Sequence, residues 1–322
     1  MREIIINSNE AGQRFDKFLG KYLSEASMGF LFKMLRKKNI TLNGKKATGK
    51  EKLNKGDSVK LFLADETILK FSGKVNVKLY DKKLDIIYED DNVLLINKPA
   101  GMLSQKAQQS DVSVVEYLIS YLIKSEQLNE KDLKTFHPSV CNRLDRNTSG
   151  LIAAGKSLSG LQELSKMFKD RSMEKYYLCI VSGIVDKPSR IKGYLRKDEK
   201  TNKVTISNEQ SEDGSYIETA YRPIKTGDNL TLLEVLLVTG KTHQIRAHLA
   251  SIGHPLLGDA KYGSRSVNDE FKKKYGLKNH LLHSYRIVFP KLEGPLENLS
   301  NKEFKAGLSK EFKNIGVKEG IL

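Results

Sequence analysis

The stretch NRLDRNTSG, residues 142–150, decides how the rest of the chain is interpreted. It places the carboxylate of Asp145 between two permanent cations, Arg143 and Arg146, and it ends in Thr-Ser-Gly. One interpretation is an ordinary turn, because Asp, Asn, Ser and Gly are common turn formers. The other is a carboxylate that is kept ionised for chemistry. The remaining sequence has to distinguish the two.

The composition indicates a globular protein with a polyanionic partner. Of the 322 residues, 39% are hydrophobic and 29% are charged, which is typical of a folded domain and not of a disordered chain. The 55 Lys and Arg outnumber the 39 Asp and Glu, for a net charge of +16. Since phosphate neutralisation releases counterions, this excess points to nucleic acid more than to a merely lysine-rich surface.

Other classes of protein fit the sequence less well. There is no run of 18 or more apolar residues for a membrane span, and the N-terminal segment has no signal-peptide pattern. The two cysteines fit a reducing cytoplasm. His243 and His248 lack the spacing of a helical zinc pair. We therefore expect a cytoplasmic protein without metal or cofactor, and nothing in the sequence suggests an obligate dimer, so we expect a monomer.

Residues 1–63 are expected to form a separate basic domain with two short helices and a hairpin turn at Asn43-Gly44. Between Lys33 and Lys60 there are ten Lys or Arg and only two acids, a distribution that suits a phosphate backbone. The pattern resembles the S4 domain over residues 13–63, which implies binding to structured RNA. The cations that we expect to bind it are Lys33, Arg36, Lys37, Lys38, Lys45 and Lys46.

Residues 64–84 are expected to be a linker, and residues 85–322 a larger domain. Strand-like and helix-like runs are interspersed there without a regular βαβ repeat, so the fold class should be α+β. We expect a mixed, mainly antiparallel sheet flanked by helices. GLIAAGKS, residues 150–157, matches the P-loop pattern. Its inter-glycine residues are apolar and strand-like, however, so an ATP-binding interpretation is disfavoured.

A second dense stretch, residues 239–263, reads TGKTHQIRAHLASIGHPLLGDAKYG. Its Arg246 offers a planar cation that could pair bidentately with Asp145 and favour the charged carboxylate. An oriented carboxylate is a competent nucleophile or base. No second acid stands beside it in the sequence, which argues against a two-carboxylate glycosidase. Cofactor-free isomerisation of uridine to pseudouridine in RNA fits these requirements.

The two stretches are similar to the signature blocks of the RluA superfamily of pseudouridine synthases, and with the basic N-terminal module they resemble its RluC/RluD subgroup. INKPAGM, EKYYLCIVSG and LLHSYRIVFP resemble further blocks, so the resemblance covers most of residues 86–290. One departure is Asn142, where the family usually has His. The resemblance implies large-subunit ribosomal RNA as substrate, base flipping, and these roles: Asp145, Tyr177 and Arg246 as catalytic residues; Arg143, Ile245 and Thr148 as substrate-binding residues.

By the same resemblance, Asp145 attacks the flipped nucleotide, Arg143 fills the gap left by the base, and Tyr177 stacks on the uracil and assists proton removal from C5. Ile245 is then an apolar pocket residue. Two alternatives stay open: a catalytically silent RNA-binding or ribosome-assembly factor with the same fold, and a synthase acting on transfer RNA. The sequence does not name the target uridines, because folded RNA is recognised by shape.

Overall fold

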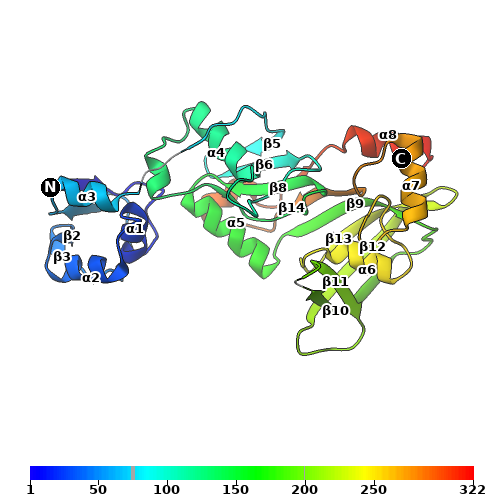
Figure 1. Ribbon diagram of the computed structural model, residues 1–322, viewed down its shortest axis with the longest axis horizontal. Helices are drawn as coiled ribbons and strands as arrows, with labels where there is room; N and C mark the ends of the chain where they lie inside the picture. The colour runs from blue at the N-terminus through cyan, green and yellow to red at the C-terminus, as the bar shows by residue number, and fades with distance from the viewer. Residues whose placement is uncertain (74–76, 199) are drawn as a thin grey trace.

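The computed structural model describes residues 1–73, 77–198 and 200–322. Figure 1 shows an elongated molecule with a small N-terminal unit at one end and a larger unit built on one long sheet. The C-terminal helices lie at the opposite end of the larger unit from the N-terminal unit. Among the described residues, no helix combines the length and apolar character needed to cross a membrane.

The N-terminal unit is a four-stranded antiparallel sheet, in the order β1-β4-β2-β3, with helices packed on it. As predicted, a hairpin turn falls at Asn43 and Gly44, which both have positive φ, the conformation of the tight turns that join two strands. The basic second helix is also confirmed. The elements are β1 Arg2–Ile5, α1 Phe15–Tyr22, α2 Met28–Arg36, β2 Ile40–Leu42, β3 Lys45–Lys46, β4 Ser58–Leu61 and α3 Asp65–Phe71.

Helix α3 lies inside the stretch 64–84 that the sequence suggests to be a linker. Its Ile68 is fully buried in the same apolar cluster as Phe15 and Phe18 of α1. Phe71 also packs against this cluster, with its ring centroid 4.6 Å from that of Phe30. The N-terminal unit therefore continues past residue 63. The weak periodicity of this stretch gave no signal for that contact.

The larger unit contains an eleven-stranded sheet with the order β11-β10-β12-β13-β9-β14-β8-β6-β5, on which β15 pairs with β14 and β7 with β8. All pairs are antiparallel except β14 with β8, so the expected α+β class with a mainly antiparallel sheet is confirmed. Its elements are β5 Ile86–Glu89, β6 Val93–Lys98, α4 Val114–Lys124, η1 Asp132–Lys134, β7 Ser139–Val140, β8 Ser149–Gly155, α5 Leu158–Asp170, β9 Glu174–Ser182, β10 Ser189–Asp198, β11 Lys203–Ser207, β12 Ser215–Thr226, β13 Leu230–Leu237, α6 Gln244–Ser251, α7 Arg265–Tyr275, β14 Leu282–Val288, η2 Gly294–Leu299, β15 Glu303–Lys305 and α8 Lys310–Lys318.

Alternate residues of the central strands enter two different apolar cores. In β8, Ile152 and Ala154 face the core that also holds α4 and α6, whereas Leu151 and Ala153 face the core that holds α5. This follows from the two-residue period of a strand. It also explains why residues 150–157 are not a phosphate-binding loop: the segment between the glycines is a buried strand, and Ser157 caps α5.

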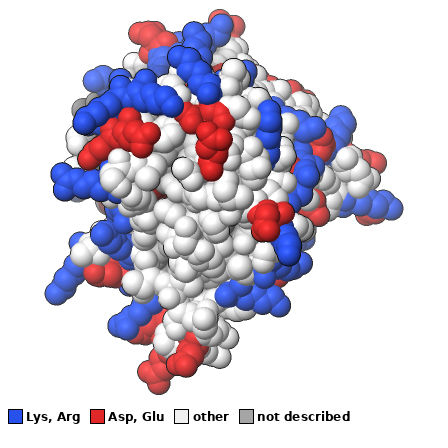
Figure 2. All heavy atoms as spheres, turned by 90° about the vertical axis from the view of Figure 1, so that its right-hand side faces the viewer, with Lys and Arg blue, Asp and Glu red and all other residues white. Residues whose placement is uncertain are grey.

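The end of the larger unit that lies farthest from the N-terminal unit carries mixed charge. Figure 2 faces this end and shows basic and acidic side chains around a central area that has neither. The helices α7 and α8 lie at this end (Figure 1). The excess positive charge of the chain is therefore not gathered into a patch on this surface.

Candidate active site

Asp145 lies in the short loop between β7 and β8, at the edge of a hollow of about 1010 Å³. Its carboxylate is half-buried. The loop is a turn in which the Thr148 N–H donates to the Asp145 carbonyl (3.0 Å). The buried hydroxyl of Ser104 bonds to both backbone groups of Leu144, at 2.8 and 3.0 Å. The carboxylate is thus presented from a loop whose backbone is held on both sides.

Lys98, in the INKPAGM block, stabilises this loop through hydrogen bonds to backbone carbonyls. Its side chain is fully buried, and Nζ donates to the carbonyls of Pro99 (3.0 Å), Met102 (2.8 Å) and Arg146 (3.1 Å). Burial lowers the pKa of Lys98 to about 7, while the nearby charge of Asp145 acts in the opposite direction. Three carbonyls match the three donors of an ammonium group, so Lys98 organises the backbone immediately after Asp145.

The Thr-Ser-Gly end of the opening stretch has a structural explanation for each residue. The Thr148 hydroxyl lies 2.8 Å from His280 Nε2, and the Ser149 hydroxyl lies 2.8 Å from His283 Nδ1. Gly150 has φ +109°, and a Cβ there would lie 2.2 Å from the Ser284 carbonyl oxygen. Only glycine allows β8 to approach β14 this closely. The small residues therefore join the Asp145 loop to the sheet.

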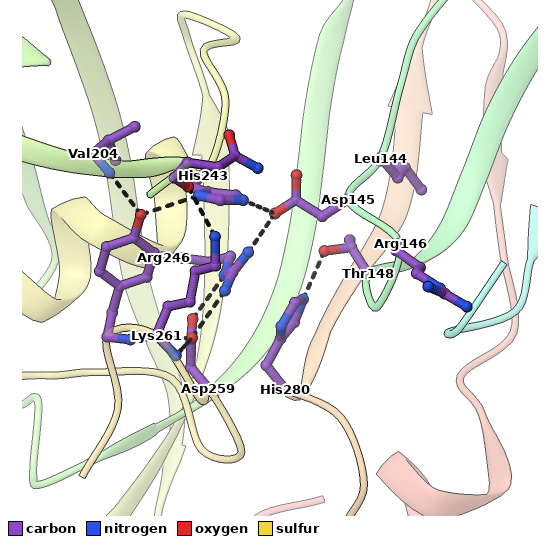
Figure 3. Close-up of polar contacts among 12 residues, drawn as sticks. Leu144, Asp145, Arg146, Thr148, Val204, His243, Arg246, Asp259, Lys261 and His280 are labelled. Carbon is purple, nitrogen blue, oxygen red and sulfur yellow. Dashed lines mark hydrogen bonds and ion pairs between the residues drawn. The ribbon is translucent and has the colours of Figure 1, made fainter. Parts of the chain in front are cut away.

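Arg246, on α6, connects Asp145 to a second acid. Its Nη1 donates to Asp145 Oδ2 at 2.8 Å, while Nε and Nη2 donate to Asp259 at 2.7 and 2.9 Å. Figure 3 shows the three side chains converging, with Arg146 directed away from them. The predicted pairing with Asp145 is present, but the bidentate partner is Asp259. The guanidinium fork is thus oriented by the buried acid and offers its remaining edge to Asp145.

The electrostatics of this cluster favour the charged forms of Asp259 and Arg246. Burial alone would raise the pKa of Asp259, but hydrogen bonds and attraction from Arg246 outweigh it and hold that pKa below its usual range. Burial likewise opposes the charge of Arg246, but the two carboxylates raise the pKa of its guanidinium. Asp259 is fully buried, whereas Asp145 is half-exposed to the hollow. Of the two acids, only Asp145 can therefore reach a ligand.

His243 faces the same carboxylate from the N-terminus of α6. The Tyr262 hydroxyl accepts the Val204 N–H (2.9 Å) and lies 3.0 Å from His243 Nδ1. The hydroxyl still has a proton to donate, and donation to Nδ1 would select the ring tautomer protonated on Nε2. Burial lowers the pKa of His243, with the Asp145 charge opposing the shift. In that tautomer the Nε2 proton faces Asp145 Oδ2, which lies 3.8 Å from Nε2.

Substituting Tyr262→Phe should slow turnover about fivefold, with little change in KM. The loss of one hydrogen bond costs about 1 kcal/mol, and here it frees the His243 tautomer that faces Asp145. Single-turnover kinetics on a modifiable RNA would measure it. Tyr216→Phe is the matched control, because Tyr216 is exposed on β12 and bonds only to Glu218 in the described structure. An equal effect of both variants would contradict the orienting role.

Tyr177 lies on the same side of the sheet as Asp145. Along β9, Tyr177 and Cys179 belong to the core next to α6, while Leu178 faces the opposite core. Tyr176 points away and lies under the Arg286 guanidinium, 3.8 Å from the ring centroid. The strand register therefore selects Tyr177 over its neighbour. Ile245 is buried beside it, and both line the hollow together with Thr148.

Arg143 and Asn142 occupy the rim of the hollow. Arg143 is exposed. Asn142 instead binds β8: its Oδ1 accepts the Ala153 N–H at 2.8 Å and its Nδ2 donates to the Leu151 carbonyl at 3.3 Å. The amide thus extends the pairing of β7 with β8, so the departure from the family His is accommodated in the structure by hydrogen bonds to the backbone.

The six N-terminal cations form a separate group. All are exposed, on α2, on the residues after it and on the β2–β3 hairpin. They do not line the hollow that contains Asp145. The structure therefore presents two distinct surfaces to a long ligand. The residues concerned are Lys33, Arg36, Lys37, Lys38, Lys45 and Lys46.

Sequence reasoning missed Asp259, Tyr262 and Lys98. A signal for Asp259 existed: it is the only acid in residues 239–263, and it follows the segment LLG. A fully buried carboxylate requires a cationic partner, and Arg246 was available. Lys98 lay within a quoted block and ends a strand that begins with four apolar residues. Neither signal specifies which atoms meet.

Comparisons with known proteins agree with this geometry. Residues 92–251 match the family model described as RNA pseudouridylate synthase. The chain is 30% identical over 301 residues to the ribosomal large subunit pseudouridine synthase C of Vibrio vulnificus, covering 91% of this chain and 90% of that protein. It is 29% identical to an uncharacterized RNA pseudouridine synthase of Mycoplasma capricolum, covering 94% and 96%. The fold is similar to human RNA Pseudouridylate Synthase Domain Containing 4, with TM-score 0.58, 20% identity and coverage of 73% of this chain and 92% of that chain.

The family match and the relatives thus define an enzyme that isomerises a nucleoside within RNA. The chain belongs to the RluA-type RNA pseudouridine synthases. Large-subunit ribosomal RNA enzymes are among its relatives.

Proposed function

We propose that this synthase modifies uridines of large-subunit ribosomal RNA, with Asp145 as its nucleophile. The observation that carries the proposal is the Asp145 carboxylate, held 2.8 Å from Arg246 at the edge of the hollow. The names of relatives such as the Vibrio vulnificus enzyme support the choice of RNA. The orientation of this carboxylate is set by its loop, by the buried Lys98 and by Arg246.

The reaction needs no co-reactant. The target uridine leaves the RNA stack and enters the hollow, at a cost of a few kcal/mol. The Asp145 carboxylate attacks C1′ of the ribose, and the bond from C1′ to N1 of uracil breaks. The detached uracil rotates, and its C5 attacks C1′ and displaces the carboxylate. Loss of the C5 proton and protonation of N1 complete an isomerisation in which no atom is gained or lost.

The other pocket residues position the base. We assign Tyr177 to stacking on the uracil, with Ile245 and Thr148 as neighbouring wall. Burial raises the pKa of Tyr177 to about 12, and the charge of Asp145 adds to this effect. The phenol is therefore protonated at neutral pH, which favours stacking over proton removal by a phenolate. Arg143, exposed at the rim, would fill the space left by the flipped base.

The N-terminal unit would supply affinity for the RNA. We propose an S4-like RNA-binding domain at residues 1–63, with the segment 64–84 connecting it to the catalytic domain at residues 85–322. Helix α3, at the start of that segment, belongs with the N-terminal core. The exposed cations of α2 and the β2–β3 hairpin would bind phosphates. We further propose that the enzyme works in the cytoplasm as a monomer, without metal or cofactor.

Tritium release from RNA labelled at C5 of uridine tests this function. Purified enzyme without added cofactor should release tritium from unmodified large-subunit ribosomal RNA at least about tenfold faster than from transfer RNA, as expected where one site-recognising contact of about 1.4 kcal/mol or more separates the two. Mapping of pseudouridine would then identify the sites. Faster release from transfer RNA would overturn the proposal that large-subunit ribosomal RNA is the substrate. Tight binding to ribosomal RNA without release from any RNA would indicate the catalytically silent alternative.

A further inference from the structure

A second hollow, of about 480 Å³, lies where the N-terminal unit meets the catalytic unit. We call it the inter-unit cleft. One wall comes from the end of α1, another from residues 77–80, and a third from the catalytic unit around α4 and η1. Figure 1 shows α1 on the side of the N-terminal unit that faces the catalytic unit. The lysines that line the cleft are Lys21, Lys78, Lys106 and Lys134.

Hydrogen bonds hold the segments that form the walls of the cleft. The bond across the two units is buried: the Thr135 hydroxyl donates to the Glu10 carboxylate at 2.7 Å. On the N-terminal side, the Gly73 N–H donates to Ser24 (3.2 Å). On the catalytic side, the Tyr80 N–H donates to Ser120 of α4 (3.0 Å). The walls of the cleft are therefore held in place by specific hydrogen bonds.

The charge in the cleft is predominantly positive. Glu116 caps α4 through Ser113 and pairs with Lys106 at 3.3 Å, so its charge is compensated. Within the part of the chain that the structure describes, no ion pair joins Lys21, Lys78 or Lys134 to a carboxylate. Glu25 is the remaining acid of the lining. Besides the Lys106–Glu116 pair, three lysines and one glutamate remain in the lining, a net charge of +2. Lys21 Nζ also donates to Gln13 Oε1 at 3.0 Å.

The cleft lining also contains a histidine, whose pKa responds to the lysines, and two aromatic rings. Burial lowers the pKa of His137, and the charge of Lys21 lowers it further. Tyr22 and Tyr80 also line the cleft, and Lys78 lies 5.5 Å from the Tyr80 ring centroid. Lysines interleaved with aromatic rings are what proteins use to hold a nucleic-acid strand by its phosphates and bases.

The inter-unit cleft adjoins the hollow that contains Asp145. Lys106 lines both, and its neighbours from Leu103 to Ala107 form part of the wall of the catalytic hollow. A strand that leaves the catalytic hollow past this segment enters the cleft directly. The N-terminal cations of α2 and the β2–β3 hairpin do not line the cleft.

We propose that the inter-unit cleft binds the phosphate backbone of the substrate RNA on one side of the target uridine, so that the strand runs from Asp145 past Lys106 to Lys78, Lys134 and Lys21. The occupant is RNA because the chemistry required is a string of phosphates with interspersed rings. The proposal relies on the proposed function only for the RNA substrate, not for which RNA it is.

The test compares two charge-matched double variants of the full chain. Lys78→Gln with Lys134→Gln removes two cleft cations, and Lys272→Gln with Lys273→Gln removes two exposed cations of α7 at the distant end (Figure 1). Dissociation constants for a long ribosomal RNA fragment would be measured from 50 to 200 mM salt. The cleft variant should lower the slope of log K against log salt by about 1.5, since each phosphate contact contributes ~0.7–0.9. It should also weaken binding by about tenfold.

A short stem–loop that contains only the target loop separates the possible results. It should bind the cleft variant as it binds the wild type, and tritium release from it at saturation should be unchanged. Equal slopes for the two double variants would overturn the cleft as an RNA site. Equal weakening on the short stem–loop would also overturn it, because the lysines would then act on the catalytic hollow. Absence of release by the wild type would count against the proposed function alone, as the salt slopes need no turnover.

Discussion

The Asp145→Asn variant should lose tritium release by at least about 10⁴-fold, the scale seen when a nucleophile is removed. Asparagine keeps the shape and the hydrogen-bond acceptor for Arg246 Nη1, but its amide is not a nucleophile toward the ribose. The RNA dissociation constant should stay within about threefold of the wild type, because the cations that bind phosphate are untouched. Single-turnover release and filter binding would measure the two quantities.

Asp269→Asn is the matched control, because Asp269 is an exposed residue of α7 that pairs only with Arg265 in the described structure. It should leave both quantities unchanged. Mass spectrometry of Asp145→Asn would exclude regeneration of the carboxylate by deamidation. Full release by an intact asparagine variant would show that another group attacks the ribose, and would leave Asp145 as a purely structural partner of Arg246.

The sequence predicted the contact between Asp145 and Arg246, although the two residues are 101 positions apart. It did so through charge complementarity and through a resemblance that orders the two blocks. It did not predict that Asp259 would hold the other edge of Arg246. A guanidinium can satisfy two carboxylates, and the sequence shows only one of them next to a turn signal. Which acid is buried depends on how α6 packs, and this is a tertiary property.

For the fold, local elements could be predicted from the sequence, but contacts between distant segments could not. Residue types indicated the hairpin turn at Asn43-Gly44, and the apolar, strand-like residues within 150–157 indicated the strand in β8. The parallel pairing of β8 with β14 carried no local signal, because it joins segments 134 residues apart through the Ser149–His283 contact. Helix α3 was missed for a similar reason: Ile68 and Phe71 pack against residues of α1 and α2 that are distant in sequence, and a seven-residue helix is too short to show a periodic pattern.

The Arg246→Met variant should lose both activity and stability. Methionine leaves the fully buried Asp259 without its cation, and breaking a buried pair costs about 3–5 kcal/mol of unfolding free energy. Activity should fall by about 10²–10³-fold, since an oriented donor to the reacting group is lost. Denaturant unfolding and single-turnover release would measure the two effects. Arg286→Met, which removes a half-exposed arginine on the other face, is the control.

Adding Asp259→Leu to Arg246→Met separates the two effects. The double variant removes the buried carboxylate that has lost its partner, so it should regain about half or more of the lost stability. It should not regain activity, because Asp145 still lacks its donor. Recovery of both would mean that Arg246 serves only to neutralise Asp259, and that the aim of Asp145 depends on the loop held by Lys98 and Ser104.

The pH dependence of the stability of Arg246→Met independently tests whether the unpaired charge of Asp259 causes the loss. In the wild type the pKa of Asp259 is held below its unfolded value, so the stability it contributes is present above that unfolded value and is lost as the pH falls through the folded one. Without Arg246, burial raises the pKa of Asp259, so its charged form destabilises the fold near neutral pH. The stability deficit of Arg246→Met should therefore shrink on acidification. A deficit that stayed constant with pH would place the damage in lost packing, because methionine and arginine differ there regardless of charge.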